Sequence, residues 1–272
     1  MQERLQYKNH MGEVIDFGRF GIFVSGSDLH DYSWTISQKN GKISSFKRDV
    51  AKRTLPVVIL CNTAEEGVAA RNKLMEVAEK DVLAKKPGRI VIGDYYYKCY
   101  ITESKKSKYL ASRRRMEVDL TISSDEPYWV REDLHSFRKK GVTDPGLNYP
   151  HDYAFDYASH FKRTALVNTG FTASNFRMII YGPCTDPLVY VSGHAYVVNC
   201  DAAAGEYITI DSVAKTVTRT AADGTITNVF NLRGRESYIF EKIRSGDNLV
   251  TWGGDFGVDI ILLEERSEPK WT

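Results

Sequence analysis

Closely spaced turn dipeptides divide the second half of the chain into short apolar segments, and this spacing constrains the fold more than any other feature. Each segment has the length of a β-strand, and no stretch of helical periodicity lies between them. The segments are FRMIIYG, PLVYVSG, HAYVVNC, EYITID, KTVTRT, TITNVF, SYIFEKI, NLVTWG and VDIILLEE. Pairs such as Ser192-Gly193 and Asp223-Gly224 separate them. The pattern predicts a β-sandwich or jelly roll, with residues 258–263 as a central strand because they are apolar on both faces except at Asp259.

The first half combines strand-like segments with one helix. Strands are expected at 13–17, 20–24 and 32–36, and Asn40-Gly41 is a strong signal for a hairpin turn. The continuous apolar run LPVVILC, residues 55–61, predicts a strand that is buried on both faces.

The helix is predicted to begin after Thr63, which forms a capping box with Glu66. Helical spacing places Val68, Met75, Ala78 and Val82 on one apolar face, and Pro87-Gly88 ends the helix. We interpret this helix as packed on a sheet. The alternative is an isolated amphipathic helix that binds a partner.

A basic segment, residues 103–115, lies between two further strands at 94–101 and 116–123. Its cations are Lys105, Lys106, Lys108, Arg113, Arg114 and Arg115. One reading is a solvated hairpin tip, and a nucleic-acid site is weakly supported because Tyr109 is the only interleaved aromatic residue. The sharper hypothesis is a contact with another subunit. Its partners would be the acids of the helix: Glu65, Glu66, Glu76, Glu79 and Asp81.

The stretch NYPHDYAFDYASH, residues 148–160, has the composition of a metal site but the wrong spacing. His151, Asp152, Asp156 and His160 match no metal-binding signature, and in an extended chain the two histidines lie about 30 Å apart. We therefore expect no bound metal. The tract instead marks a joint between two domains.

Charge and composition support two domains and exclude several functions. The first 150 residues carry an excess of basic side chains and the remainder an excess of acidic ones. We expect a first domain at 1–128, a linker at 129–150 and a second domain at 151–272. No apolar run long enough to span a membrane occurs, and the N-terminal residues contain no apolar h-region, so we expect neither a membrane span nor Sec-type export.

Catalytic motifs are missing from the sequence, so we expect neither an enzyme nor a cofactor. A nucleophile elbow and a P-loop are absent, and pairing His194 with Asp211-Ser212 would be arbitrary. A carbohydrate-binding adhesin or receptor-binding protein is the competing class. Its candidate aromatic residues are Trp252, Tyr190, Tyr196 and Trp271.

Taken in order, several segments resemble the distal tail protein family of long-tailed phages and prophages, over essentially the whole chain. They are the opening strand YKNHMGEVIDF, the helix-plus-strand unit at 63–102, the strand MEVDLTISSDEPYW, the aromatic joint YPHDYAFDY, and the segments 203–230 and 243–252. The joint is less repetitive here than in the family, and the charged insert at 131–144 has no counterpart that we can place.

The resemblance implies a mainly β fold with one helix. An N-terminal belt domain, similar to a tail-tube subunit, would build a homohexameric ring, and residues 1–128 alone would suffice. A C-terminal galectin-like jelly roll would bear receptor-binding proteins. The ring would join the tail tube to the tail-tip fibre protein and let DNA pass through its channel. Such a protein resides in the virion after assembly in the host cytoplasm. The basic segment could then contact the tail tube or the tape-measure protein instead of a neighbouring subunit.

Overall fold

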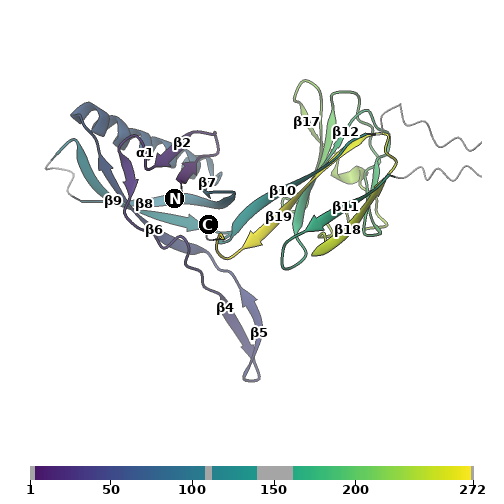
Figure 1. Cartoon of the computed structure of the whole chain (residues 1–272), viewed down its shortest axis with the longest axis horizontal. Coiled ribbons are helices and arrows are strands. Elements are labelled where there is room, and N and C mark those ends of the chain that lie inside the picture. Colours follow the sequence, from purple (N-terminus) through teal and green to yellow (C-terminus); the bar gives the residue numbers. More distant parts are fainter. Residues whose placement is uncertain (1–3, 108–111, 140–161, 271–272) are drawn as a thin grey trace, which may run out of the picture. The chain divides into compact units, whose positions relative to one another are not determined.

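The computed structural model describes residues 4–107, 112–139 and 162–270, which divide into two compact units. Unit 1 comprises residues 1–131 and 265–272, and unit 2 comprises residues 132–264. The part described is mainly β with a single α-helix, so the predicted fold class is confirmed (Figure 1). No helix within the described ranges is both long enough and apolar enough to cross a bilayer.

Two strands connect the units. Strand β10 (Trp129–Phe137) starts in unit 1, and β19 (Gly257–Arg266) ends there. The segment expected as a linker, 129–150, therefore begins with a strand, and its residues from 140 onward lie outside the described residues, as does the aromatic tract at 148–160. A fragment that stops at residue 128 would lack the C-terminal part of unit 1.

Unit 1 consists of strands, the helix and one separate hairpin. Its elements are β1 (Leu5–Lys8), β2 (Val14–Phe17), β3 (Ile22–Val24), β4 (Thr35–Lys39), β5 (Lys42–Lys47), β6 (Ala51–Leu60), α1 (Ala64–Ala84), β7 (Gly88–Ile92), β8 (Tyr95–Ser107) and β9 (Arg115–Ser124). Strands β8, β7, β1 and β2 are neighbours in that order, β6 pairs with β3 and β9, and β9 also pairs with β8. Within the described part of the chain, strands β4 and β5 pair only with each other.

The predicted helix N-terminus is confirmed, because Thr63 and Glu66 form a capping box. The Thr63 hydroxyl accepts a hydrogen bond from the Glu66 N–H at 3.1 Å, and the Glu66 carboxylate accepts from the Thr63 N–H at 3.2 Å. We expect Thr63→Ala to lower the free energy of unfolding of unit 1 by about 1 kcal/mol. Urea unfolding should show this loss, and Thr63→Ser should retain wild-type stability because its hydroxyl can still accept. An unchanged midpoint for Thr63→Ala would contradict the assignment.

The predicted buried face of α1 is only partly correct, because Ala78 is buried but the two predicted valines are not. Val68 and Val82 are exposed and Met75 is only partly buried, whereas the helix buries Gly67, Ala70, Leu74, Val77, Ala78 and Asp81. These residues also have helical spacing, but the buried face contains glycine, alanine and aspartate, so it is not recognisable as an apolar face from the sequence. Gly67 has no room for a side chain, because a Cβ atom there would lie 2.2 Å from the carbonyl oxygen of Arg113.

The strand predicted from LPVVILC is present as part of β6, but it is not buried on both faces. Leu55, Val57 and Ile59 point into the core, whereas the opposite face carries Val58 and Leu60, and Leu60 is 54% exposed. On β3, Phe23 pairs with Val58 and is also exposed. Unit 1 thus leaves an apolar patch on the outer face of this sheet uncovered.

Unit 2 is a sandwich of two antiparallel sheets. Its further elements are β11 (Lys162–Asn168), β12 (Asn175–Tyr181), β13 (Leu188–Val191), β14 (His194–Val197), β15 (Tyr207–Asp211), β16 (Thr216–Thr220), β17 (Ile226–Asn228), a 3-10 turn η1 (Phe230–Leu232) and β18 (Gly246–Trp252). One sheet has the order β17-β16-β15-β12-β19-β10, and the other has the order β11-β18-β13-β14. Phe176 and Ile260 from the first sheet meet Leu166 and Trp252 from the second in one buried core.

Most strands predicted for unit 2 are confirmed, including 258–263, which lie in β19 between β12 and β10. SYIFEKI is the exception. Residues 237–243 form no strand, because a turn closes between Tyr238 and Glu241 and directs Ile239 and Phe240 into the core. Strand β11 was not predicted.

Candidate assembly surface

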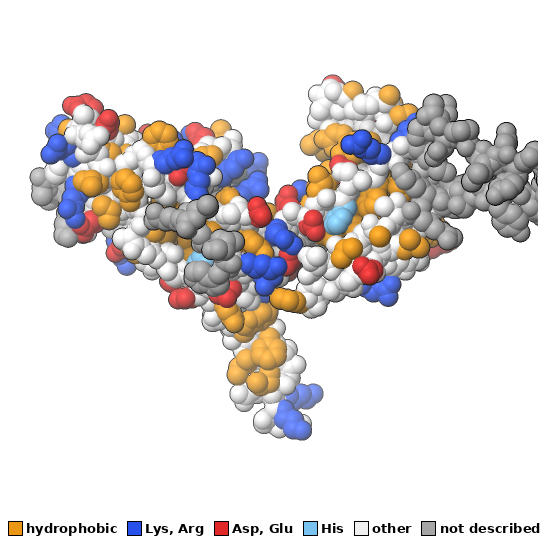
Figure 2. All heavy atoms as spheres, in the orientation of Figure 1, with side chains coloured by type: hydrophobic (Ala, Val, Ile, Leu, Met, Phe, Trp, Pro, Cys, Tyr) orange, Lys and Arg blue, Asp and Glu red, His pale blue; other side chains and the backbone are white. Residues whose placement is uncertain are grey.

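The β4–β5 hairpin exposes an apolar face. It projects from the rest of unit 1 in Figure 1, and Figure 2 shows hydrophobic side chains along it and basic side chains at its tip. Trp34, Ile36, Ile43 and Phe46 are 42%, 46%, 54% and 60% exposed, respectively. An isolated two-stranded hairpin is only marginally stable in water, and exposed apolar patches often mark contact surfaces, so this face is a candidate assembly surface.

A β-bulge gathers these side chains on one face. Ile36 pairs with Phe46, and two residues later Gln38 pairs with Ile43, so Ser44 is the extra residue. Without the bulge, Ile43 and Phe46 would lie on opposite faces, because alternate residues of a strand point to opposite sides. The resulting hairpin has an apolar face and a face of serine, threonine and lysine.

Aromatic and basic residues fix the base of the hairpin to unit 1. The Arg48 guanidinium lies 4.4 Å from the centre of the Trp34 ring and 5.2 Å from that of Tyr128. It also donates a hydrogen bond to the Ser267 hydroxyl at 3.3 Å. Trp34 packs edge-on against Phe46. The C-terminal segment therefore helps to hold the hairpin where it leaves the unit.

A second apolar surface of unit 1 is a cleft of about 730 Å³ beside β3 and α1. Phe20, Phe23, Leu60 and Ala69 supply its apolar lining, and Glu66 is among its charged residues. Phe20 is 81% exposed. The cleft and the hairpin are formed by different segments, so unit 1 presents two distinct apolar surfaces.

The basic segment forms a hairpin between β8 and β9, as predicted. Lys105, Lys106, Arg113, Arg114 and Arg115 are exposed, and Lys108 lies outside the described residues. Several of these cations already have partners within the chain. Lys105 is 3.3 Å from Glu103, the Arg115 guanidinium donates to Glu117 at 2.8 Å, and that of Arg114 donates to the carbonyl of Asn62 at 3.1 Å.

Of the acids of α1 expected to contact such a hairpin, three are exposed and available. Glu65, Glu76 and Glu79 are exposed, and Glu66 serves the capping box. Asp81 is fully buried, so its proposed role as a partner for another subunit is wrong.

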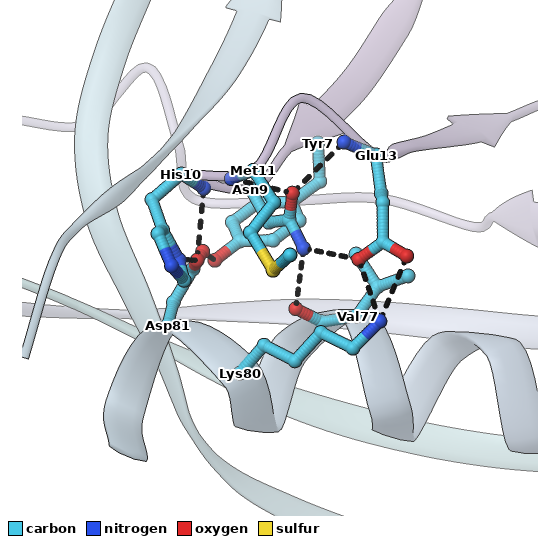
Figure 3. Close-up of polar contacts among 8 residues, drawn as sticks. All are labelled: Tyr7, Asn9, His10, Met11, Glu13, Val77, Lys80 and Asp81. Atoms are coloured by element: carbon cyan, nitrogen blue, oxygen red, sulfur yellow. Dashed lines mark hydrogen bonds and ion pairs between the residues drawn. The ribbon is translucent and has the colours of Figure 1, made fainter. Parts of the chain in front are cut away.

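Asp81 instead forms the centre of a buried polar cluster (Figure 3). Its carboxylate accepts hydrogen bonds from the Tyr7 hydroxyl, from the His10 backbone N–H at 2.9 Å and from Nδ1 of the His10 ring at 2.5 Å. Burial and the bond to Asp81 raise the pKa of Tyr7 far above its usual range. The cluster fixes the turn between β1 and β2 to the last turns of α1.

A second set of contacts in Figure 3 extends this attachment. The Lys80 ammonium donates to both Glu13 oxygens at 2.8 and 2.9 Å, and the Asn9 amide donates to Glu13 at 2.7 Å. The Lys80 ammonium holds the pKa of the Glu13 carboxyl below its usual range.

In unit 2, the residues considered for catalysis serve the fold. Asp211 accepts hydrogen bonds from the N–H groups of Val213 and Ala214, both at 2.9 Å. The Ser212 hydroxyl accepts from the Phe176 N–H at 2.7 Å, and His194 donates to the carbonyl of Tyr238. No three metal-ligating side chains cluster among the described residues. The segment with His151, Asp152, Asp156 and His160 lies outside them.

Of the aromatic residues considered for sugar binding, Tyr190 lines a cavity of unit 2. Trp252 and Tyr196 are buried in the core, as expected for strand residues with inward alternation. Trp271 lies outside the described residues. Tyr190 lies on the outer face of the β11-β18-β13-β14 sheet.

Comparison with known proteins shows which fold this is. No protein-family model and no curated protein matches the chain. Among solved structures, the chain is similar to the Dit protein of phage SPP1, described as a paradigm of the hub of the adsorption apparatus in phages that infect Gram-positive bacteria. The TM-score is 0.61 at 10% identity, over 97% of this chain and 99% of that one.

Chains of the phage P2 baseplate in its activated conformation are also similar. The structure with calcium gives a TM-score of 0.65 at 14% identity, and that with strontium gives 0.67 at 15%. Each likeness covers 99% of this chain and 100% of the other. The chain therefore has the fold of phage hub and baseplate proteins, which confirms the fold implied by the resemblance.

Proposed function

We propose that the protein is a structural distal tail protein of a long-tailed phage or prophage. Unit 1 builds a homohexameric ring that joins the tail tube to the tail-tip fibre protein, and DNA passes through its channel. Unit 2 is galectin-like and carries a receptor-binding protein. The ring resides at the tail tip of the virion after assembly in the host cytoplasm.

The two apolar surfaces of unit 1 carry this proposal. A closed ring requires a heterologous interface, in which one patch of a subunit contacts a different patch of the next. The apolar face of the β4–β5 hairpin and the cleft beside β3 are two such patches. The similarity to hub and baseplate proteins over nearly the full length supports a structural rather than a catalytic role.

Light scattering on the purified full-length chain tests the proposal, together with negative-stain images. We expect six times the subunit mass and closed rings. A monomer or trimer would contradict it and favour the adhesin. Open-ended tubes would favour a tail-tube protein with an appended sandwich.

The basic hairpin is expected to affect the rate of assembly more than its end point. Arg113→Glu combined with Lys106→Glu reverses two exposed charges and leaves the contacts of Arg114 and Arg115 intact. Exposed ion pairs contribute only about 0.2–1 kcal/mol each, but charges at the rim of an interface strongly affect association rates. We expect slower ring formation at low salt and a smaller difference at high salt, where charges are screened.

Time-resolved light scattering measures this rate, and Lys242→Glu in unit 2 is the matched control. Wild-type rates for the double variant at low salt would exclude the subunit contact. That result would leave a contact between the basic segment and the tail tube or tape-measure protein as the remaining hypothesis.

A further inference from the structure

A cavity of about 910 Å³ in unit 2 lies between one sheet and a loop. Its floor is the outer face of β13 and β14, where Leu188, Tyr190, Ala195 and Val197 alternate with residues that point into the core. Its wall is the loop at 231–237. Sites for small ligands in proteins usually have volumes of about 300–1,000 Å³.

The loop is fixed to the edge of β14, so the cavity is already formed. Two of the hydrogen bonds join backbone groups: the Gly234 N–H donates to the Val197 carbonyl at 2.9 Å, and the Asn199 N–H donates to the Leu232 carbonyl at 2.7 Å. Two more involve side chains: the Ser237 hydroxyl donates to the Ala195 carbonyl at 2.5 Å, and His194 Nε2 donates to the Tyr238 carbonyl at 2.9 Å. Gly234 allows the close approach, because a Cβ atom there would lie 2.8 Å from that of Val197. The loop also occupies the strand edge, so an extended peptide cannot pair with it.

Polar side chains of the lining are available to a ligand. Asn199, Asn231, Arg235 and Glu236 are exposed, and their side chains make no hydrogen bond or ion pair with any described residue. Together they offer N–H donors from the amides and the guanidinium, and acceptors from the amides and the carboxylate. Arg233 also lines the cavity, but its guanidinium already donates to the carbonyl of Phe230 at 2.8 Å and lies over that ring. Of the available side chains, Arg235 and Glu236 have opposite charges, so the set favours neither an anion nor a cation.

The half-buried ring of Tyr190 adds an aromatic surface to this polar set. A ligand that suits both has an apolar ring face and many hydroxyl groups without net charge. We propose that this cavity binds a neutral saccharide, with a sugar ring against Tyr190 and its hydroxyls bonded to Asn199, Asn231, Arg235 and Glu236. This role goes beyond the proposed assembly function and does not depend on it.

Saturation-transfer NMR and calorimetry on the full-length chain test the proposal. The probes are methyl glycosides of neutral hexoses, N-acetylhexosamines and 6-deoxyhexoses at millimolar concentration. We expect at least one to bind. Tyr190→Ala and Asn231→Ala should each weaken that binding by about tenfold, which corresponds to about 1.4 kcal/mol. Asn231 is exposed, so its replacement leaves the core intact even if Tyr190→Ala fails to fold.

Tyr207→Ala is the matched control, because Tyr207 is also a half-buried strand tyrosine of unit 2 and lies outside this cavity. It should bind the probe like wild type. The proposal is overturned if no glycoside binds, or if neither Tyr190→Ala nor Asn231→Ala weakens binding more than Tyr207→Ala does. Light scattering on each variant reports ring formation separately, so a failure of the assembly proposal remains distinguishable.

Discussion

Replacing Ile36 and Phe46 with aspartate is expected to leave the full-length chain folded but monomeric. The two residues face each other across the hairpin and are about half exposed in the single chain. Fully burying a large apolar side chain contributes about 1.5–3 kcal/mol. Because each of the two is already about half buried, the pair contributes about 1.5–3 kcal/mol to each contact. Two carboxylates in an apolar contact add a desolvation cost. The loss corresponds to at least about tenfold weaker association at each contact, which light scattering would detect as a mass shift.

The opposite face of the same hairpin provides the control. Ser37 and Ser45 also pair across the strands, and their replacement by aspartate adds the same charges to the polar face. This variant should assemble like wild type. Equal loss of the ring in both variants would mean that charge on the hairpin, and not its apolar face, controls assembly. Rings from the Ile36→Asp, Phe46→Asp variant would show that the hairpin lies outside the interface.

The sequence predicted the fold well wherever periodicity was regular and local. The strict alternation in MEVDLTIS correctly placed Met116, Val118, Leu120 and Ile122 in the core. Thr63 and Glu66 marked the helix start because the capping box depends only on residues three positions apart. Turn dipeptides located most strands of unit 2, because a turn signal also depends only on neighbouring residues in the sequence.

The apolar face of the hairpin was not predicted, although its turn was. In the segment from Trp34 to Phe46, Ile43 and Phe46 are an odd number of residues apart, so regular alternation places them on opposite faces. The bulge at Ser44 reverses that assignment, and a single sequence gives no clear signal for a bulge. The exposure of these side chains is equally difficult to predict, because in a sequence an apolar residue at a protein contact cannot be distinguished from an apolar residue of the core.

Most of the buried face of α1 was missed for a different reason. Asp81 lies in the middle of that face, and a charged residue is normally taken as a sign of the solvent side. Its burial depends on Tyr7 and His10, which are more than seventy residues away in the sequence. Such long-range pairing cannot be read from local periodicity.

Asp81→Ala should therefore destabilise unit 1 more than any substitution on the exposed side of α1. Removing the carboxylate leaves the fully buried Tyr7 hydroxyl and the His10 ring without their acceptor. Removal of one partner from a buried charged network costs about 3–5 kcal/mol. Urea unfolding measures the loss. Glu79→Ala, two residues earlier and exposed, should change the free energy of unfolding by no more than about 0.5 kcal/mol.

A double-mutant cycle separates the network from simple loss of packing. Tyr7→Phe removes only the hydroxyl, so it deletes the bond to Asp81 while keeping the buried ring. If the two residues stabilise the unit through that bond, the cost of Asp81→Ala should be smaller in the Tyr7→Phe background, because no buried hydroxyl is then left unpaired. If the losses in unfolding free energy of the two single variants add up to that of the double variant, the two residues stabilise the unit independently, each through its own packing.

The cycle also bears on assembly. A chain that unfolds at α1 loses one wall of the apolar cleft, so ring formation should fall in parallel with stability.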